Sequence, residues 1–173
     1  MTGSLRVALL RGVNVGGVTV KSAQLAEVFR GLGYTDVRTV LASGNVLFSG
    51  SGSRSEQAAT IERALSDEFG YSARVIVSDQ VAIDAIVEAY PFDEVDDRQP
   101  YVVFVEKASD IPALLELADG LDESVERVQK GDGVLYWEVR KGMSTDSTFS
   151  KRTARTPGIL LTTRNLRTLR KLL

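Results

Sequence analysis

The hydrophobic pattern of the first half of the chain predicts six elements in the order β-α-β-β-α-β. Continuous or alternating apolar residues favour strands, and apolar residues that recur every three or four positions favour helices. The expected strands are Leu5 to Leu10, ending near Arg11, then Val37 to Leu41, Val46 to Phe48 and Ala73 to Val77. The expected helices carry two apolar sets, Leu25, Val28, Phe29, Leu32 and Ile61, Leu65, Phe69. Ser22 is the expected cap of the first helix, and Ser53 with Glu56 has capping-box spacing before the second.

The second half of the chain repeats this order. A helix from Asp79 to Tyr90 and a polar, acidic loop from Pro91 to Pro100 precede it. The expected strands are Tyr101 to Val105, Val125 to Val128, Val134 to Val139 and Ile159 to Leu161. Helices are expected after the cap Asp110, at Asp146 to Arg152, and from Arg164 onward. Neighbouring residues of a strand point to opposite faces, so of Tyr136 and Trp137 one is expected to be buried and the other to line a surface.

Two successive β-α-β-β-α-β orders predict an α+β fold of two tandem ferredoxin-like lobes packed together, with a linker helix and a C-terminal helix. The expected divisions are a first lobe at 1–78, the linker helix and acidic loop at 79–100, and a second lobe at 101–173. In such a lobe, the end of the first strand and the turn between the second and third strands lie at the same edge of the sheet. Arg11, Asn14, Ser43 and Asn45 are therefore expected to share one face.

A glycine-rich loop follows the first strand, with Gly12, Gly16 and Gly17 after Arg11. Successive backbone N–H groups in such a loop can form a concavity that binds an anion, and the Arg11 guanidinium would add further donors. The alternative is a tight strand-to-helix connection in which the glycines serve only the turn. The glycine spacing matches neither the dinucleotide-binding fingerprint nor the Walker A loop, so the sequence indicates no particular nucleotide.

Composition excludes several classes of chemistry. The 173 residues are 43% hydrophobic and 25% charged, which is typical of a globular chain, and they include neither cysteine nor histidine. Disulfides, thiol chemistry, histidine bases and Cys/His zinc sites are therefore excluded. The acidic group Asp93, Glu94, Asp96 and Asp97 lacks calcium-loop spacing and favours a solvated linker over a magnesium site, so neither a metal nor a cofactor is expected. The apolar stretches are too short for a signal peptide or a membrane span, so we expect a cytoplasmic protein with no membrane contact.

The net charge of −2 hides an uneven distribution. Residues 84–126 contain thirteen acidic and two basic side chains, whereas residues 147–173 contain seven basic and no acidic ones. This separation is compatible with an anionic partner, including a nucleic acid. It is equally compatible with the two regions facing each other within the fold or across a homodimer.

Three segments together resemble the hallmark motifs of the domain of unknown function 1697 family. They are Leu-Arg-Gly-Val-Asn-Val-Gly-Gly at 10–17, Ala-Ser-Gly-Asn-Val at 42–46 and Thr-Thr-Arg-Asn-Leu-Arg-Thr-Leu at 162–169. The resemblance implies a bacterial-type α+β protein of two similar ferredoxin-like halves, without an established activity. Leu166 stands where relatives usually have Trp. The site residues that the resemblance carries over by motif position are Arg11, Gly12, Asn14, Gly16, Gly17, Ser43, Gly44, Asn45, Thr163, Arg164, Asn165 and Thr168.

These observations lead to one hypothesis and two alternatives. The hypothesis is a small anionic or polar ligand bound by the Arg11 loop, the Ser43 turn and the start of the helix at Arg164, where free N–H groups attract anions. Capping of that helix by Thr163 is the structural alternative at this position. The alternative functions are a nucleic-acid-binding module that uses the basic C-terminal region, and a structural or self-associating protein. Ser43 and Thr163 have no identifiable base beside them, so neither is indicated as a nucleophile.

Overall fold

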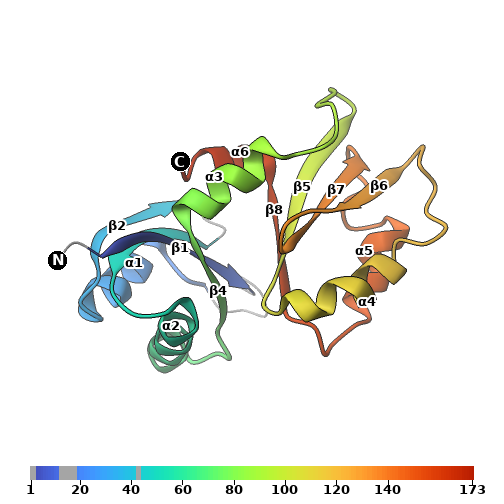
Figure 1. The fold of residues 1–173 in the computed structure, drawn as a ribbon. Coiled ribbons are helices and arrows are strands. Elements are labelled where there is room, and N and C mark those ends of the chain that lie inside the picture. Colours follow the sequence, from blue (N-terminus) through green and yellow to red (C-terminus); the bar gives the residue numbers. More distant parts are fainter. Residues whose placement is uncertain (1–2, 12–18, 42–43) are drawn as a thin grey trace. The chain divides into compact units, whose positions relative to one another are not determined.

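A computed structural model describes residues 3–11, 19–41 and 44–173 of the chain (Figure 1). The contacts divide the chain into two compact units, Met1–Asp84 with Arg170–Leu173, and Ala85–Leu169. Each unit contains a four-stranded antiparallel sheet, and the described residues also form six α-helices. The α+β class expected from the sequence is confirmed. None of the helices in the described ranges is long and apolar enough to cross a membrane.

The sheet of the first unit has the strand order β2-β3-β1-β4. Its strands are β1 (Ser4–Arg11), β2 (Thr35–Val40), β3 (Asn45–Gly50) and β4 (Arg74–Asp79). The helices α1 (Ser22–Gly31) and α2 (Arg54–Phe69) follow β1 and β3 along the chain. Strand β1 is central and pairs with β3 on one side and β4 on the other, which places Leu9 between Asn45 and Ile76.

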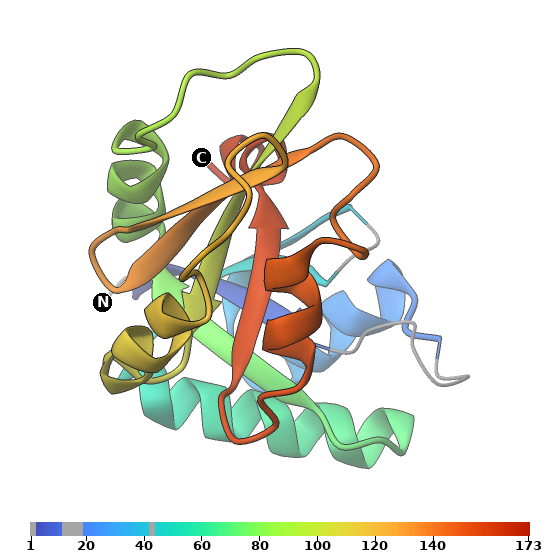
Figure 2. The ribbon, with the colours of Figure 1, turned by 90° about the vertical axis from the view of Figure 1, so that its right-hand side faces the viewer.

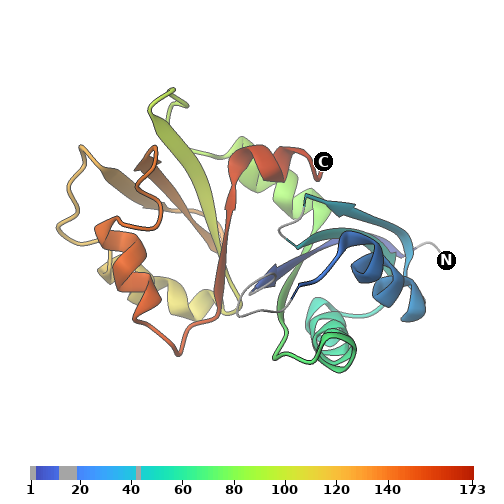
Figure 3. The same cartoon turned by 180° about the vertical axis from the view of Figure 1, so that it is seen from behind.

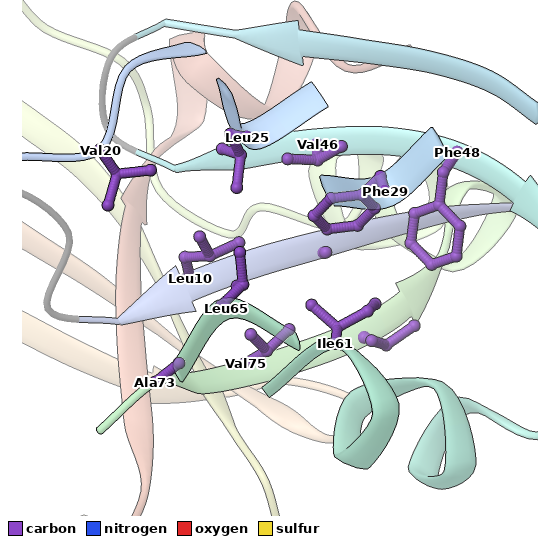
Figure 4. Close-up of a cluster of buried hydrophobic side chains, with 12 residues drawn as sticks. Leu10, Val20, Leu25, Phe29, Val46, Phe48, Ile61, Leu65, Ala73 and Val75 are labelled. Atoms are coloured by element: carbon purple, nitrogen blue, oxygen red, sulfur yellow. The ribbon is translucent and has the colours of Figure 1, made fainter. Parts of the chain in front are cut away.

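Helices α1 and α2 cover one face of this sheet (Figure 3). Ala8 and Leu10 point from β1 into the core on this side, because alternate residues of a strand share a face. Leu10 is labelled in Figure 4, and the other side chains labelled there come from the two helices, from β3 and β4, and from the segments that precede α1 and β4. Val7 and Leu9 point from β1 to the opposite face and are also fully buried.

The last residues of the described chain belong to the first unit. Leu172 is fully buried, and its carbonyl accepts a hydrogen bond of 2.8 Å from the side-chain amide of Gln80. The carbonyl of Lys171 accepts a longer one, 3.4 Å, from the Arg38 guanidinium. The first unit is therefore built from two segments that are far apart in the sequence.

The sheet of the second unit has the order β6-β7-β5-β8, which corresponds strand for strand to that of the first unit. Its strands are β5 (Arg98–Val105), β6 (Glu126–Lys130), β7 (Val134–Arg140) and β8 (Leu161–Asn165). The helices are α4 (Ile111–Glu116), after a short 3₁₀ turn, and α5 (Thr148–Ala154). The unit boundary runs through α3 (Gln80–Glu88), and α6 (Leu166–Arg170) follows β8 directly.

Helices α4 and α5 lie on one face of this second sheet (Figure 2). The core on that side contains Trp137 of β7 and Phe149 of α5, together with apolar residues of β5 and α4. Tyr136 points to the opposite face, where its hydroxyl donates a 2.6 Å hydrogen bond to the carbonyl of Ile86 in α3. Tyr136 and Trp137 thus face opposite sides as expected, but both are buried, so the expectation that one lies on the surface was wrong.

Several local expectations can be compared with the structure. The capping box before α2 is confirmed, because Ser53 Oγ accepts from the Glu56 N–H and Glu56 Oε2 accepts from the Ser53 N–H. Ser22 was expected to cap α1, but it is the first helical residue and Lys21 is the N-cap, without a side-chain hydrogen bond. Asp110 is at the N-cap of α4 as expected, yet its side chain makes no capping hydrogen bond either.

Candidate functional site

The third motif begins in a strand and continues into a helix that starts at Leu166, so the expectation of a helix beginning at Arg164 was wrong. Residues Leu161–Asn165 form β8, and Val103 and Val102 of β5 pair with Thr163 and Arg164. Helix α6 begins at Leu166, directly after β8, and Asn165 Oδ1 accepts a 2.8 Å hydrogen bond from the backbone N–H of Arg167. Asn165 therefore supplies the cap that was assigned to Thr163, and Arg164 does not lie at a helix N-terminus that could attract an anion.

Strand β8 separates two of the expected site residues. Thr163 pairs with Val103, whose side chain belongs to the core beneath α4 and α5, whereas Arg164 pairs with Val102 on the other face. Because residues directly opposite in an antiparallel pair share a face, Thr163 and Arg164 point to opposite sides of the sheet. Asn165 and Thr168 are half-buried, so neither is enclosed in the core.

Arg164 is a buried cation. It is 8% exposed, and its guanidinium Nη1 donates to Thr162 Oγ1 at 2.6 Å and to the carbonyl of Thr163 at 3.0 Å. Burial lowers the pKa of Arg164 to about 10, because loss of hydration disfavours the charged form. The side chain still carries its charge at neutral pH, and the two hydrogen bonds hold the guanidinium in one orientation.

The described parts of the first two motifs lie next to each other in the first unit. The Leu10 N–H donates a 2.9 Å hydrogen bond to the carbonyl of Gly44, and Leu9 pairs with Asn45. Arg11 and Asn45 therefore lie on the same face as Leu9, the one opposite α1 and α2. This is the shared edge that the sequence predicted. Gly12, Asn14, Gly16, Gly17 and Ser43 lie outside the described residues.

The turn between β2 and β3 has an unusual backbone. Gly44 has a φ of +80°, which glycine adopts without steric cost, and Leu41 has a φ of +59°, which is rare for a residue with a β-carbon. Asn45 is fully buried and its amide Nδ2 donates a 3.0 Å hydrogen bond to the carbonyl of Val40. Asn45 thus has a structural role in closing this turn, whatever else it contacts. Arg11 is exposed at the end of β1.

Comparison with known families decides the classification. Residues 4–136 match the family described as protein of unknown function (DUF1697). The chain belongs to this family. The match includes the first two motifs and ends before β8, so the motif around Arg164 lies beyond it.

A solved structure has the same fold. It is titled "The structure of conserved bacterial protein SP0830 from Streptococcus pneumoniae", and it is similar with a TM-score of 0.76 and 20% sequence identity. The similarity covers 99% of this chain and 97% of that chain. At this identity the likeness concerns the fold alone. Comparison with proteins of curated function gives no match.

The second unit of this DUF1697 chain contains a charged cluster that the sequence analysis missed. Glu138 is 2% exposed, and both of its carboxylate oxygens accept from Arg127 Nη2, at 3.0 and 3.2 Å. Arg98 Nη1 lies 3.6 Å from Glu138 Oε1, and the Arg127 guanidinium lies over the Phe92 ring, 4.6 Å from its centroid. The sequence feature that could have indicated this ion pair is the β6–β7 hairpin, because its register puts Arg127 directly opposite Glu138.

This charged cluster affects the ionisation of the half-buried Tyr90. Burial raises the pKa of Tyr90, and the negative charges of Glu138 and Glu94 raise it further. A hydroxyl that holds its proton so firmly is a poor general base, so Tyr90 is not a catalytic candidate. In the described ranges of the chain, no group of three or more acidic side chains is arranged to hold a metal ion.

Proposed function

We propose that this chain binds a small anionic or polar ligand, with Arg164 as the main positive contact. The observation that carries the proposal is a side chain that is charged at neutral pH and held in a buried position. The lowering of the Arg164 pKa from 12.5 to about 10 corresponds to about 3 kcal/mol of lost hydration for the charged form. A cation kept at that cost is a candidate functional group, because perturbed ionisable groups concentrate at functional sites.

The chemistry of the guanidinium supports an oxygen anion as the ligand. Its planar fork of donors matches carboxylate and phosphate groups, and such charge-assisted hydrogen bonds are stronger in a poorly hydrated environment. The hydrogen bonds to Thr162 and Thr163 reduce the entropy lost when the side chain contacts a ligand. In the first unit, Arg11 is a separate candidate contact for an anion, supported by its position beside the turn that contains Leu41, a residue with a rare positive φ.

A thermal-shift series tests this proposal. The wild type, Arg164→Gln and Arg164→Lys would be heated with phosphate, a sugar phosphate, a nucleoside triphosphate, a dicarboxylate or a short oligonucleotide. A ligand present at a hundred times its dissociation constant adds about 2.7 kcal/mol, which raises the melting temperature by roughly 5–10 °C for a chain of this size. We expect Arg164→Gln to lose this shift and Arg164→Lys to retain only part of it, because lysine keeps the charge without the fork.

The matched control is Arg167→Gln, which removes the same charge from an exposed position in α6. It should keep the full shift. An equal shift in Arg164→Gln, or no shift with any anion, would refute the proposal. A shift with the oligonucleotide alone would favour nucleic-acid binding, and a concentration-dependent dimer without any ligand effect would favour self-association. We also propose a cytoplasmic location, which fractionation of the producing cells would test.

We further propose that each unit has a ferredoxin-like fold. The support is the strand order, since the first strand of each unit lies between its third and fourth strands and all neighbours are antiparallel. Two helices pack on one face of each sheet, as this fold requires. An experimental structure of either unit would test this assignment.

A further inference from the structure

A cavity of about 230 Å³ lies in the second unit, between the sheet and α5. Three aromatic side chains line it, those of Tyr101, Trp137 and Phe149. Hydroxyl groups line it as well, among them those of Ser150, Thr153 and Thr163. Thr163 is the only one of these residues that the sequence motifs had singled out, and it enters this cavity because it lies on the opposite face of β8 from Arg164.

The aromatic wall is held in place by a buried carboxylate. Glu126 Oε1 accepts a 3.0 Å hydrogen bond from Trp137 Nε1, and Glu126 Oε2 accepts one of 3.2 Å from the Phe149 N–H. The Trp137 ring lies 5.2 Å from that of Tyr101 and 5.7 Å from that of Phe149, measured between centroids. The Tyr101 hydroxyl donates to Gln99 Oε1. The polar atoms of Trp137 and Tyr101 are thus already bonded, and the rings themselves form the wall.

The serine and threonine hydroxyl groups that line the cavity remain available to a ligand. Thr153 donates to the carbonyl of Ser150, which leaves its oxygen as an acceptor. Within the part of the chain that the structure describes, the hydroxyls of Ser144, Ser150 and Thr163 make no side-chain hydrogen bond. These residues are half-buried and so can be reached from solvent. Each hydroxyl can donate one hydrogen bond and accept others.

Charge and size narrow the class of ligand. None of the described residues that line the cavity has a charged side chain, so nothing there compensates a ligand charge. Carboxylate and amide groups, which suit a polyhydroxylated sugar, are also absent from this lining. The volume is below the range of drug-sized pockets, so one ring fits and a dinucleotide does not. Aromatic walls favour a planar ring over a puckered one.

We propose that this cavity binds a small uncharged planar heterocycle of the size of a single nucleobase, between the Trp137 wall and the hydroxyls of α5 and β8. The rings of the wall contact the faces or edges of the ligand. The hydroxyls of Ser150 and Thr163 then satisfy its ring nitrogens and carbonyl oxygens. This site is independent of the anion contact at Arg164, which lies on the other face of β8.

Trp137 makes the test direct, because it is the single tryptophan of the chain and it lines the cavity. Its emission would be followed during titration with uracil, cytosine and adenine, and calorimetry would check each response. Orotate is the anionic counterpart of uracil, and inositol is a neutral ring of similar size that is not planar. We expect a saturable change with at least one neutral heterocycle, at least tenfold weaker binding of orotate than of uracil, and no response to inositol.

Three variants locate the response. Ser150→Leu fills the cavity from α5 and should abolish binding, while Thr163→Val removes one hydroxyl at constant shape and should weaken binding about five- to tenfold. Thr35→Val makes the same change at an exposed position of β2 and should have no effect. Far-UV circular dichroism checks that each variant is folded. Failure of all three heterocycles, equal binding of orotate and uracil, or full binding in Ser150→Leu would each overturn the proposal.

The two proposals, an anion contact at Arg164 and a heterocycle in the cavity, can be refuted independently of each other. Arg164→Gln should lose the anion-dependent thermal shift and keep the heterocycle response, whereas Ser150→Leu should show the reverse. Loss of both responses in either folded variant would contradict the independence of the two sites.

Discussion

The ion pair between Arg127 and the buried Glu138 offers the sharpest test of the energetics. We expect Glu138→Gln to destabilise the protein by about 3 kcal/mol, because it leaves Arg127 and Arg98 without the carboxylate that both approach. Glutamine keeps the size of the side chain and one acceptor oxygen, so the change is mainly one of charge. At roughly 2–4 °C per kcal/mol, the melting temperature should fall by about 6–12 °C.

The Arg30–Glu27 pair of α1 is the control. Its N–O distance is 2.6 Å, shorter than the 3.0 Å of Arg127–Glu138, but both of its side chains are exposed (53% and 72%), whereas in Arg127–Glu138 the carboxylate side chain is buried and that of Arg127 is 43% exposed. Water screens an exposed pair, so Glu27→Gln should cost less than about 0.5 kcal/mol and lower the melting temperature by less than about 2 °C. Distance alone would predict the opposite order.

Both variants would be unfolded by heat and by urea. Far-UV circular dichroism follows the whole chain, and Trp137 emission follows the second unit, which contains Glu138. The reasoning would be refuted if Glu27→Gln lowered the melting temperature as much as Glu138→Gln. It would also be refuted if Glu138→Gln left the Trp137 transition unchanged.

Two further measurements address local structure and ionisation. Ser53→Ala removes the hydroxyl that accepts from the Glu56 N–H, so it should lower the free energy of unfolding in urea by about 1 kcal/mol. The control Ser55→Ala, in the same turn, should lower it by less than half of that. Equal losses of stability in the two variants would contradict the capping role of Ser53. Burial raises the pKa of four tyrosines, so the folded state holds these protons more tightly, and stability should fall as the pH rises above the unfolded-state value of 10.0. Tyrosinate absorbance of the folded protein should therefore rise at higher pH than that of the urea-unfolded protein, and coincident titrations would exclude the shift. The four residues are Tyr34, Tyr71, Tyr90 and Tyr136.

Local patterns predicted the elements that local forces determine. The spacing of Leu25 and Phe29 identified α1, since a helix must bury one stripe of side chains. Ser53 and Glu56 located the start of α2, because their capping hydrogen bonds join residues only three apart. The two β-α-β-β-α-β orders likewise predicted the two four-stranded sheets, since each hairpin has a recognisable turn.

Elements that depend on distant partners were predicted less well. Strand β5 begins at Arg98, inside the stretch expected to be a loop, because Arg98, Gln99 and Pro100 pair with β7. Pro100 is tolerated there because β8 pairs only from Tyr101 onward, so no partner on that side needs its missing N–H. The β8 strand was mistaken for a helix start for a related reason, since its pairing with β5 joins residues about sixty positions apart.

The candidate site shows the same limit. The sequence placed the Arg11 end of β1 beside the Gly44 turn correctly, because a strand order is enough to specify a sheet edge. The sequence pattern placed Thr163 and Arg164 together at the start of one helix, and so in one site. Both residues lie in strand β8 instead. In a strand, adjacent side chains diverge, so one motif contributes to two different surfaces.

The return of residues 170–173 to the first unit affects the order of folding during synthesis. The ribosome makes all of residues 85–169 before Leu172, whose carbonyl bonds to Gln80. The unit that begins the chain is therefore completed after the unit that follows it, contrary to the usual order in which N-terminal domains finish folding first. A second unit that has already folded shortens the effective loop between Gln80 and Leu172, which lowers the entropic cost of that closure. The second unit is in effect an insertion into the first, and its folding lowers the entropic cost of completing the first unit.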